Sequence, residues 1–118
     1  TLVRGNHDAH AGDPPAALDI QPVDGPLRML GLGLSHHPRP MADAYVLAGH
    51  LHPCVALGGR ANDWHRLPCF WFGERVGVLP AFGAFTGMHG IRAQPGERVF
   101  AVAPDRVFEL PPVARRFA

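Results

Sequence analysis

Lysine is missing from this sequence of 118 residues, and all eleven basic residues are Arg. Against ten acidic residues they give a formal net charge of +1, which predicts no strong attraction to nucleic acid or to an anionic membrane surface. No apolar run approaches the roughly 20 residues that a membrane-spanning helix needs. Two cysteines, in a chain without a signal-like segment, are typical of a reducing compartment rather than of a disulfide scaffold. We therefore expect a cytoplasmic protein without a membrane partner.

Long amphipathic helices are also missing, because no stretch repeats its apolar residues at helical spacing. The 14 Gly and 13 Pro favour strands joined by turns, and a hydrophobic content of 47% is typical of a folded domain. We predict a mostly β structure with one short helix near Met41–Ala44. The almost wholly apolar run at 27–35 predicts a strand buried on both faces. The other expected strands are residues 1–4, residues 18–23 before an Asp-Gly turn, residues 44–48, and a hairpin at Pro104-Asp105.

Six of the eight His residues form three pairs, each placed directly after an apolar, strand-like run. Three parallel strands that end side by side would bring the pairs together, and imidazole is the commonest metal ligand at neutral pH. An extended backbone would point the two His residues of "GHLH" the same way. Any one of these His residues, taken alone, is more often a surface residue, but together they predict a metal site. The pairs are His7 with His10, His36 with His37, and His50 with His52.

Three motifs resemble, in the same order, the last three motifs of the calcineurin-like metallophosphoesterases. They are Gly5-Asn6-His7-Asp8, the "SHHP" at 35–38 and Gly49-His50-Leu51-His52. The stretches "AYVLAGHLHPC" and "LPCFWFGERVGVLPAFGAFTG" are more narrowly similar to the DNA-ligase-associated members, and the resemblance covers essentially the whole chain. It implies the α/β fold class, with a four-layered α/β/β/α sandwich that is mostly β in this part.

The resemblance also implies a cofactor, a substrate class and partners. The cofactor would be two divalent metal ions, with Mn²⁺ expected first and Fe or Zn as alternatives. Two such ions about 3.5–4 Å apart stabilise the attacking and the leaving oxygen of an in-line displacement. The substrate would be a phosphodiester, with nucleic acid as a candidate in a DNA repair context. DNA ligase and helicase would be functional associates.

Each matched residue takes a role from the resemblance. Asn6, His36 and His50 would bind one metal ion, and His52 would bind the other. His36 is preferred to His37 because family members align the first His of this pair.

Catalysis is assigned by the same resemblance to two residues of the first motif. His7 would stabilise the phosphoryl transition state or protonate the leaving oxygen, and Asp8 would orient His7. An acid or base held by a carboxylate is a common arrangement in general acid–base catalysis.

Two earlier motifs of the family, Asp-x-His and Gly-Asp-x-x-Asp, are missing. The "DAH" at 8–10 overlaps the first matched motif, and "GDPPA" at 12–16 lacks the final Asp. We therefore expect residues 1–118 to be the C-terminal portion of a single phosphoesterase domain, beginning in the strand before the third motif. Since the carboxylate that bridges the two ions is absent, we expect these residues alone to be inactive, although the parent protein is an enzyme.

Two alternatives to a phosphoesterase stay open. Cys54 and Cys69 with His50 and His52 have the residue types of a structural zinc site, but their spacing matches no common zinc module. A non-catalytic metal- or partner-binding β domain is the second alternative.

Outside the three motifs, two Arg residues, three exposed or structural candidates and a group of aromatic residues are also notable. Arg39 and Arg60 lie near the motif loops and are candidates to meet a substrate phosphate, although a loop Arg is usually just solvated. We expect a structural role for His89 and a surface position for Trp64 and His65. A group of aromatic residues is expected in the core, with a stacking platform for single-stranded nucleic acid as the alternative. The group is Phe70, Trp71, Phe72, Phe82 and Phe85.

Overall fold

The computed structural model describes residues 1–83 and 86–115. Short strands dominate this part of the chain, so the prediction of a mostly β member of the α/β class is confirmed. The strands are β1 (Leu2–Val3), β2 (Pro22–Val23), β3 (Leu27–Met29), β4 (Leu32–Ser35), β5 (Tyr45–Ala48), β6 (Pro53–Gly58), β7 (Trp64–Phe72), β8 (Val76–Val78), β9 (His89–Gly90), β10 (Arg98–Val102) and β11 (Val107–Glu109). The helical elements are the α-helix α1 (Asp8–Ala11) and the 3₁₀ turns η1 (Ala16–Leu18) and η2 (Arg60–Asn62). None of the helices in the described ranges has the length and apolar character needed to cross a bilayer.

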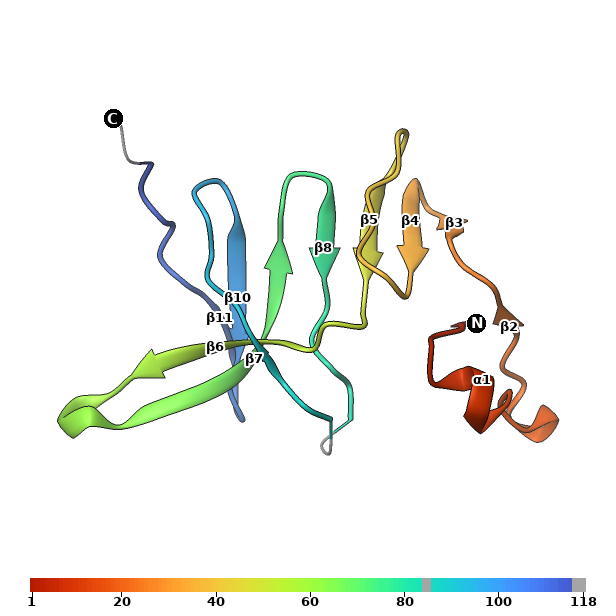
Figure 1. Ribbon diagram of the computed structural model, residues 1–118, viewed down its shortest axis with the longest axis horizontal. Coiled ribbons are helices and arrows are strands. Elements are labelled where there is room, and N and C mark those ends of the chain that lie inside the picture. The colour runs from red at the N-terminus through yellow and green to blue at the C-terminus, as the bar shows by residue number, and fades with distance from the viewer. Residues whose placement is uncertain (84–85, 116–118) are drawn as a thin grey trace.

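Nine strands belong to one continuous sheet (Figure 1). Its order is β11-β10-β7-β8-β5-β4-β3, and β6 and β9 attach to it through β7. The middle strands β4, β5 and β8 run parallel, whereas the flanking strands pair antiparallel. Because β4 and β5 are parallel neighbours, their carboxyl ends lie at the same edge of the sheet. β6 and the part of β7 that pairs with it, residues 53–68, extend away from the rest of the sheet as a two-stranded arm (Figure 1).

The apolar run at 27–35 is a hairpin, so the prediction of one strand buried on both faces is wrong. β3 pairs antiparallel with β4 around Leu30 and Gly31, whose φ angles are 53° and 77°. Positive φ at both central residues is typical of a tight two-residue hairpin turn. Leu30 is 93% exposed, and an exposed Leu in place of the usual Asn or Asp is the reason why the sequence concealed this turn.

The connection at 41–44 contains no helix, so that prediction is also wrong. Its first carbonyl, that of Met41, accepts a hydrogen bond from Nη2 of Arg75 at 2.7 Å instead of one from a helical turn. Two predictions nearby are confirmed: the strand at 45–48 forms as β5, and β10 pairs with β11 around Pro104-Asp105.

Strands β1 and β2 form a separate two-stranded parallel sheet at one end of the molecule (Figure 1). The prediction that three parallel strands end side by side is therefore right for β4 and β5 and wrong for β1. The physical reason is that β3 occupies the free edge of β4, so that β1 has no edge to pair with there. Of the strand expected at 18–23, only Pro22–Val23 forms, as β2, and it pairs with β1 and not across the Asp-Gly turn with the next strand.

The core consists of small apolar side chains in the sheet. One cluster contains Val55, Cys69, Val99 and Ala101 and lies where the arm joins β7 and β10. Val46, Ala48 and Val78 are buried in the parallel strands. No residue before Gly33 is buried, so the first two strands have no core of their own.

Candidate metal centre

The ends of two parallel strands hold the centre of the site. His36 directly follows β4 and His50 lies two residues after β5. The last residues of these strands, Ser35 and Ala48, are register partners. The pairing continues one residue further, because the N–H of Gly49 donates to the carbonyl of His36 at 3.1 Å. The sheet itself therefore fixes the two His residues beside each other, as the sequence predicted.

Asn6 reaches this pair from the loop after β1. Its Oδ1 lies 2.6 Å from Nε2 of His36, and the same Nε2 lies 3.0 Å from Nδ1 of His50. One ring nitrogen thus faces two other ligand atoms, and a single proton on it satisfies only one of them. Two ligands that each lie about 2.1 Å from one ion at right angles are about 3.0 Å apart, so these spacings fit a shared cation.

Gly5 makes this approach possible, and the sequence alone gave no sign of it. A Cβ atom built on Gly5 would lie 2.7 Å from both Cε1 and Nδ1 of the His36 ring. Any larger residue at this position would therefore push against a rigid imidazole and separate Asn6 from it. The Gly of the "GNHD" motif is explained by space, not by a left-handed backbone.

The protonation state of His36 also suits a metal ligand. Burial lowers its pKa, and the neighbouring His37 and His50 lower it further because a second positive charge beside them is unfavourable. A neutral imidazole has the free lone pair that metal binding requires. The buried position thus favours the form of His36 that binds a cation.

His37 lies close to the same centre. The ligand atoms of His36, His37 and His50 all lie within 4.8 Å of one another, and the His37 and His50 ring centroids are 4.4 Å apart. His36 nevertheless has the contact with Asn6 that completes the predicted set. The preference for His36 over His37 stays a prediction, with His37 as its neighbour and alternative.

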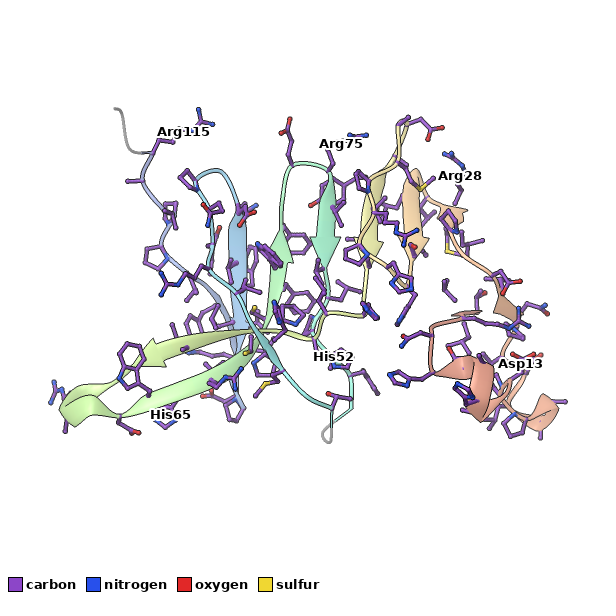
Figure 2. All side chains as sticks on the ribbon, viewed as in Figure 1. Asp13, Arg28, His52, His65, Arg75 and Arg115 are labelled. Carbon is purple, nitrogen blue, oxygen red and sulfur yellow. The ribbon has the colours of Figure 1, made fainter. Side chains whose placement is uncertain are left out.

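His52 points toward a different set of atoms. Its Nδ1 lies 3.0 Å from the carbonyl oxygen of Gly87. Because a carbonyl oxygen only accepts, Nδ1 carries the proton, and Nε2 of the neutral ring is left with its lone pair for a ligand. Figure 2 shows His52 near the base of the arm. The residue is thus oriented as a ligand, although no cluster of three ligand residues in the described ranges includes it.

The backbone of "GHLH" is not extended, so the reason given for His50 and His52 pointing the same way is wrong. Their φ angles are 70° and 51°, in the left-handed region that non-glycine residues rarely adopt. Each such residue costs of order 1–3 kcal/mol and occurs most often at functional sites. The backbone conformation of His50 and His52 is therefore of the kind that occurs most often at functional sites.

His7 and Asp8 lie at the start of α1, close enough to His36 that their charges affect its pKa. The carboxylate of Asp8 accepts a hydrogen bond from the N–H of Gly5 at 2.5 Å, which closes the "GNHD" turn. Within the described residues no hydrogen bond joins Asp8 to the His7 ring. The pairing of Asp8 with His7 stays a prediction.

The cysteines do not support the zinc alternative. Both are free and fully buried, and burial raises the pKa of the Cys69 thiol to about 12. Sγ of Cys54 receives a hydrogen bond from Nη2 of Arg66 at 3.3 Å. In the described part of the chain, no group of metal-ligand residues includes either cysteine.

The remaining candidates have mixed outcomes. Trp71 packs against the core, and Phe70 stacks on Phe72 with ring centroids 6.2 Å apart. Phe82 is fully exposed, so its predicted core position is wrong; it follows Pro80 and Ala81 in a loop, where no strand carries it inward. Phe85 lies outside the described residues.

Trp64 and His65 are exposed, as predicted. Arg39 and Arg60 are exposed as well, and their contact with a substrate phosphate stays a prediction. The N–H of His89 donates to the carbonyl of His52 at 2.8 Å, a structural contact of its backbone.

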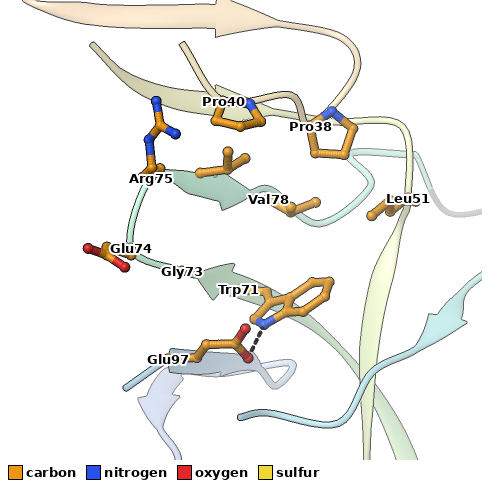
Figure 3. A pocket seen from close by; sticks show the side chains of 10 residues that line it. Pro38, Pro40, Leu51, Trp71, Gly73, Glu74, Arg75, Val78 and Glu97 are labelled. Carbon is orange, nitrogen blue, oxygen red and sulfur yellow. Dashed lines mark hydrogen bonds between the residues drawn. The ribbon is translucent and has the colours of Figure 1, made fainter. Parts of the chain in front are cut away.

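A pocket of about 410 Å³ borders the site without including its His residues (Figure 3). Pro38, which follows His36 and His37, and Leu51, which lies between His50 and His52, line one part of the pocket, and Trp71 lines the opposite wall. The indole Nε1 donates to Glu97 Oε2 at 2.8 Å. The lining is mainly apolar, with Arg75 at the rim, and suits an apolar group better than a phosphate.

The fold is similar to a solved structure, the crystal structure of Pseudomonas putida nuclease MPE. The two share 48% sequence identity and superpose with a TM-score of 0.78. The match covers 92% of this chain and 52% of that chain, so this chain spans about half the length of the nuclease. No model of a known protein family and no curated protein matches the chain. At this identity the chain resembles one half of a nuclease in both sequence and fold.

Proposed function

We propose that the chain is the C-terminal portion of a calcineurin-like metallophosphoesterase whose complete form is a metal-dependent phosphodiesterase with nuclease activity. The observation that carries the proposal is the convergence of Asn6 Oδ1 and His50 Nδ1 on Nε2 of His36. The likeness to the Pseudomonas putida nuclease supports hydrolysis of phosphoester bonds. Association with DNA ligase and helicase, and a cytoplasmic location, belong to this proposal and rest on the resemblance of the motifs.

Asn6, His36 and His50 would hold one divalent ion, and His52 would hold a second, with Mn²⁺ as the first candidate. Bound ions of this kind supply Lewis acidity and lower the pKa of a coordinated water. The part of this chain is to present imidazole nitrogens and one amide oxygen at ligand spacing. The sheet fixes the His36 and His50 backbones, and the hydrogen bond from Nδ1 of His52 to the carbonyl of Gly87 fixes the tautomer of His52.

His7 is proposed as the residue that donates a proton to the leaving oxygen or stabilises charge on the phosphoryl group. It is exposed, at the N-cap position of α1, and within electrostatic range of His36. Asp8 would act indirectly: its carboxylate holds the N–H of Gly5 and so keeps the motif turn closed. Both residues thus stand next to the proposed ligands, on the solvent side from which a substrate would approach.

The test uses the complete product of the gene that encodes this chain. Hydrolysis of bis(p-nitrophenyl) phosphate and of an oligonucleotide is measured with Mn²⁺ and with EDTA. We expect Mn²⁺-dependent turnover of both substrates that is lost in His50→Ala. Turnover of bis(p-nitrophenyl) phosphate should be retained in His65→Ala, a matched exposed His on the arm. The 118 residues alone should bind Mn²⁺ without turnover.

The outcomes separate the alternatives. Turnover that persists in His50→Ala would refute the proposed site. Binding of Mn²⁺ by the complete protein without any hydrolysis would favour a non-catalytic metal-binding domain. Tight zinc binding that is lost in Cys69→Ser would favour structural zinc.

A further inference from the structure

The arm, residues 53–68, carries a face that the proposed site does not use. Its strands β6 and β7 are paired from Cys54↔Pro68 to Gly58↔Trp64. Near its base the arm packs on the core through Val55 and Leu67. Toward its tip the chain is exposed, and Figure 1 shows this part extending clear of the sheet.

The outer face of the arm is the side opposite Val55 and Leu67. Because side chains alternate along a strand, the cross-strand pairs Gly58↔Trp64 and Ala56↔Arg66 share this outer face. None of these positions is Asp or Glu. The outer face thus combines a Trp and an Arg on a surface of small residues.

The indole of Trp64 lies against Gly58 and remains open to solvent. A Cβ on Gly58 would be 3.4, 3.5 and 3.5 Å from three carbons of the six-membered ring, so the ring rests on the glycine with its face. Trp64 is still 67% exposed. The glycine explains what supports the ring, and the exposed side of the ring is left for a flat partner.

A line of contacts connects the outer face to the candidate ligand His52. A pocket of about 260 Å³ at the base of the arm is lined by His52, Pro68 and Met88, among others. Nη2 of Arg66 donates to the carbonyl of Met88 at 3.2 Å. Trp64 lies four residues from Pro68 toward the tip of the arm, which is about 13 Å along a strand. The face therefore begins at the proposed site and leads away from it.

The charge on this face is positive. Both hydrogen bonds of Arg66 use Nη2, and among the described residues none uses its Nε or Nη1. The only acidic side chain of the arm, Asp63, pairs with His65 at 2.9 Å. An aromatic ring beside a guanidinium group suits a strand that has both bases and phosphates.

We infer that the outer face of the arm binds the nucleic-acid strand next to the scissile phosphodiester, with a base stacked on Trp64 and a phosphate on Arg66. The inference rests on the proposed function and adds to it a flanking-strand subsite. The distance of about 13 Å corresponds to about four nucleotides at the stacked spacing of 3.4 Å, and to fewer when the strand is extended. Trp64 and Arg66 are therefore positioning residues for long substrates, and a small diester does not reach them.

The experiment compares substrates of different length on the complete protein. With an oligonucleotide of about twelve nucleotides, Trp64→Ala should raise KM about 5- to 100-fold. With bis(p-nitrophenyl) phosphate it should leave kcat/KM unchanged, and Trp64→Phe should restore most of the loss because Phe still covers Gly58. Arg66→Gln should weaken binding of the oligonucleotide and reduce its salt dependence by about one phosphate contact. Leu30→Ala, a matched loss of an exposed apolar side chain at a distant turn, should change neither oligonucleotide binding nor hydrolysis of either substrate.

Binding of a labelled oligonucleotide in EDTA, followed by fluorescence anisotropy, separates this inference from the proposed function. If no protein variant hydrolyses either substrate, the proposed function fails, and weaker binding by Trp64→Ala still supports the subsite. An unchanged KM and unchanged binding in Trp64→Ala would overturn the inference. An equal loss of kcat/KM on the small diester in Trp64→Ala would overturn it too. If Trp64→Ala instead loses self-association in sedimentation without a change in oligonucleotide binding, the arm is an interface with a second copy of the chain, and the inference is overturned.

Discussion

The segment of residues 1–24 and the sheet around β7 and β10 are held together in different ways. In the sheet, buried side chains such as Val99 and Ala101 pack against the base of the arm. The segment of residues 1–24 has no buried residue. It is held by the two-residue pairing of β1 with β2 and by Arg4, which bonds Asp13 and Asp24.

The candidate metal centre lies where the segment of residues 1–24 meets the ends of β4 and β5. His36 and His50 come from strand ends fixed by the sheet, whereas Asn6 comes from the weakly held segment. Stability should therefore depend on the sheet, and metal affinity should depend on how well the segment keeps Asn6 against His36. Substitutions that affect one property without the other test this separation.

The largest expected effect on the site comes from Gly5→Ala. The added methyl would lie 2.7 Å from the His36 ring, so the ring and Asn6 move apart. Substituting the surroundings of a ligand typically costs 10–100-fold in metal affinity, and we expect the upper end, about 100-fold. Isothermal titration with Mn²⁺ measures this, and the melting temperature should change little because the segment adds no core.

Gly12→Ala is the less informative control at this end, because its φ of 81° strains any side chain. Ala9→Gly, at an exposed position of α1, changes the same segment without approaching His36. An equal loss of Mn²⁺ affinity in Ala9→Gly and in Gly5→Ala would show that the whole segment, and not the contact of Gly5 with His36, sets the position of Asn6.

Val99→Ala tests the other side of the comparison. Val99 is buried in β10 within the core cluster, and the cavity left by two methyl groups should cost about 2 kcal/mol of unfolding free energy. Mn²⁺ affinity should stay within about twofold of the wild type, because the strand ends that hold the two His residues are not part of this cluster. Urea unfolding is the measurement, with the exposed Val107→Ala as the matched control. A clear loss of affinity would show that core and site are coupled.

Another effect on the sheet is expected, and it is confined to alkaline pH. Burial raises the pKa of Cys69 from 9.0 to about 12, with a further contribution from Cys54. The unfolded thiol loses its proton from about pH 9, while the folded one keeps it, so the unfolded state binds fewer protons. Stability should therefore fall between about pH 9 and 12, by at most about 1.4 kcal/mol per pH unit. Cys69→Ala should remove this part of the slope while the contribution of Tyr45, whose pKa burial also raises, stays the same.

The sequence predicted the fold best where pattern and pairing agree. The strand at 45–48 and the hairpin at Pro104-Asp105 formed as expected, since each has apolar residues bounded by turn residues. The hairpin turn at Leu30 and Gly31 was not predicted, because an exposed Leu occupies a position where Asn or Asp is usual. The partner of β1 was missed because edge occupancy depends on where β3 lies, which no local pattern records.

The candidate site was predicted in composition and not in geometry. The three motifs brought Asn6, His36 and His50 to the right strand ends. The close packing of Gly5 on His36 could not be predicted, because it joins segments about thirty residues apart in the chain. The left-handed backbone of His50 and His52 could not be predicted either, because non-glycine residues rarely adopt it. The motif spacing predicts which residues are ligands, and the fold adds which contacts hold those residues in place.

The smallest predicted effect comes from Arg4→Gln. Arg4 lies one residue before Gly5 and makes a two-point contact with Asp13, at 2.8 and 3.0 Å, and a third contact with Asp24 at 3.0 Å. These contacts tie the loop after α1 and the end of β2 to the start of the "GNHD" turn, but exposed ion pairs are weak because water competes for them. Mn²⁺ affinity should therefore fall by less than about fivefold, and hydrogen exchange should increase in residues 1–24 alone. Increased exchange in the sheet as well would show that the two regions are one cooperative unit, whereas Arg106→Gln, near the C-terminal hairpin, should leave both measurements unchanged.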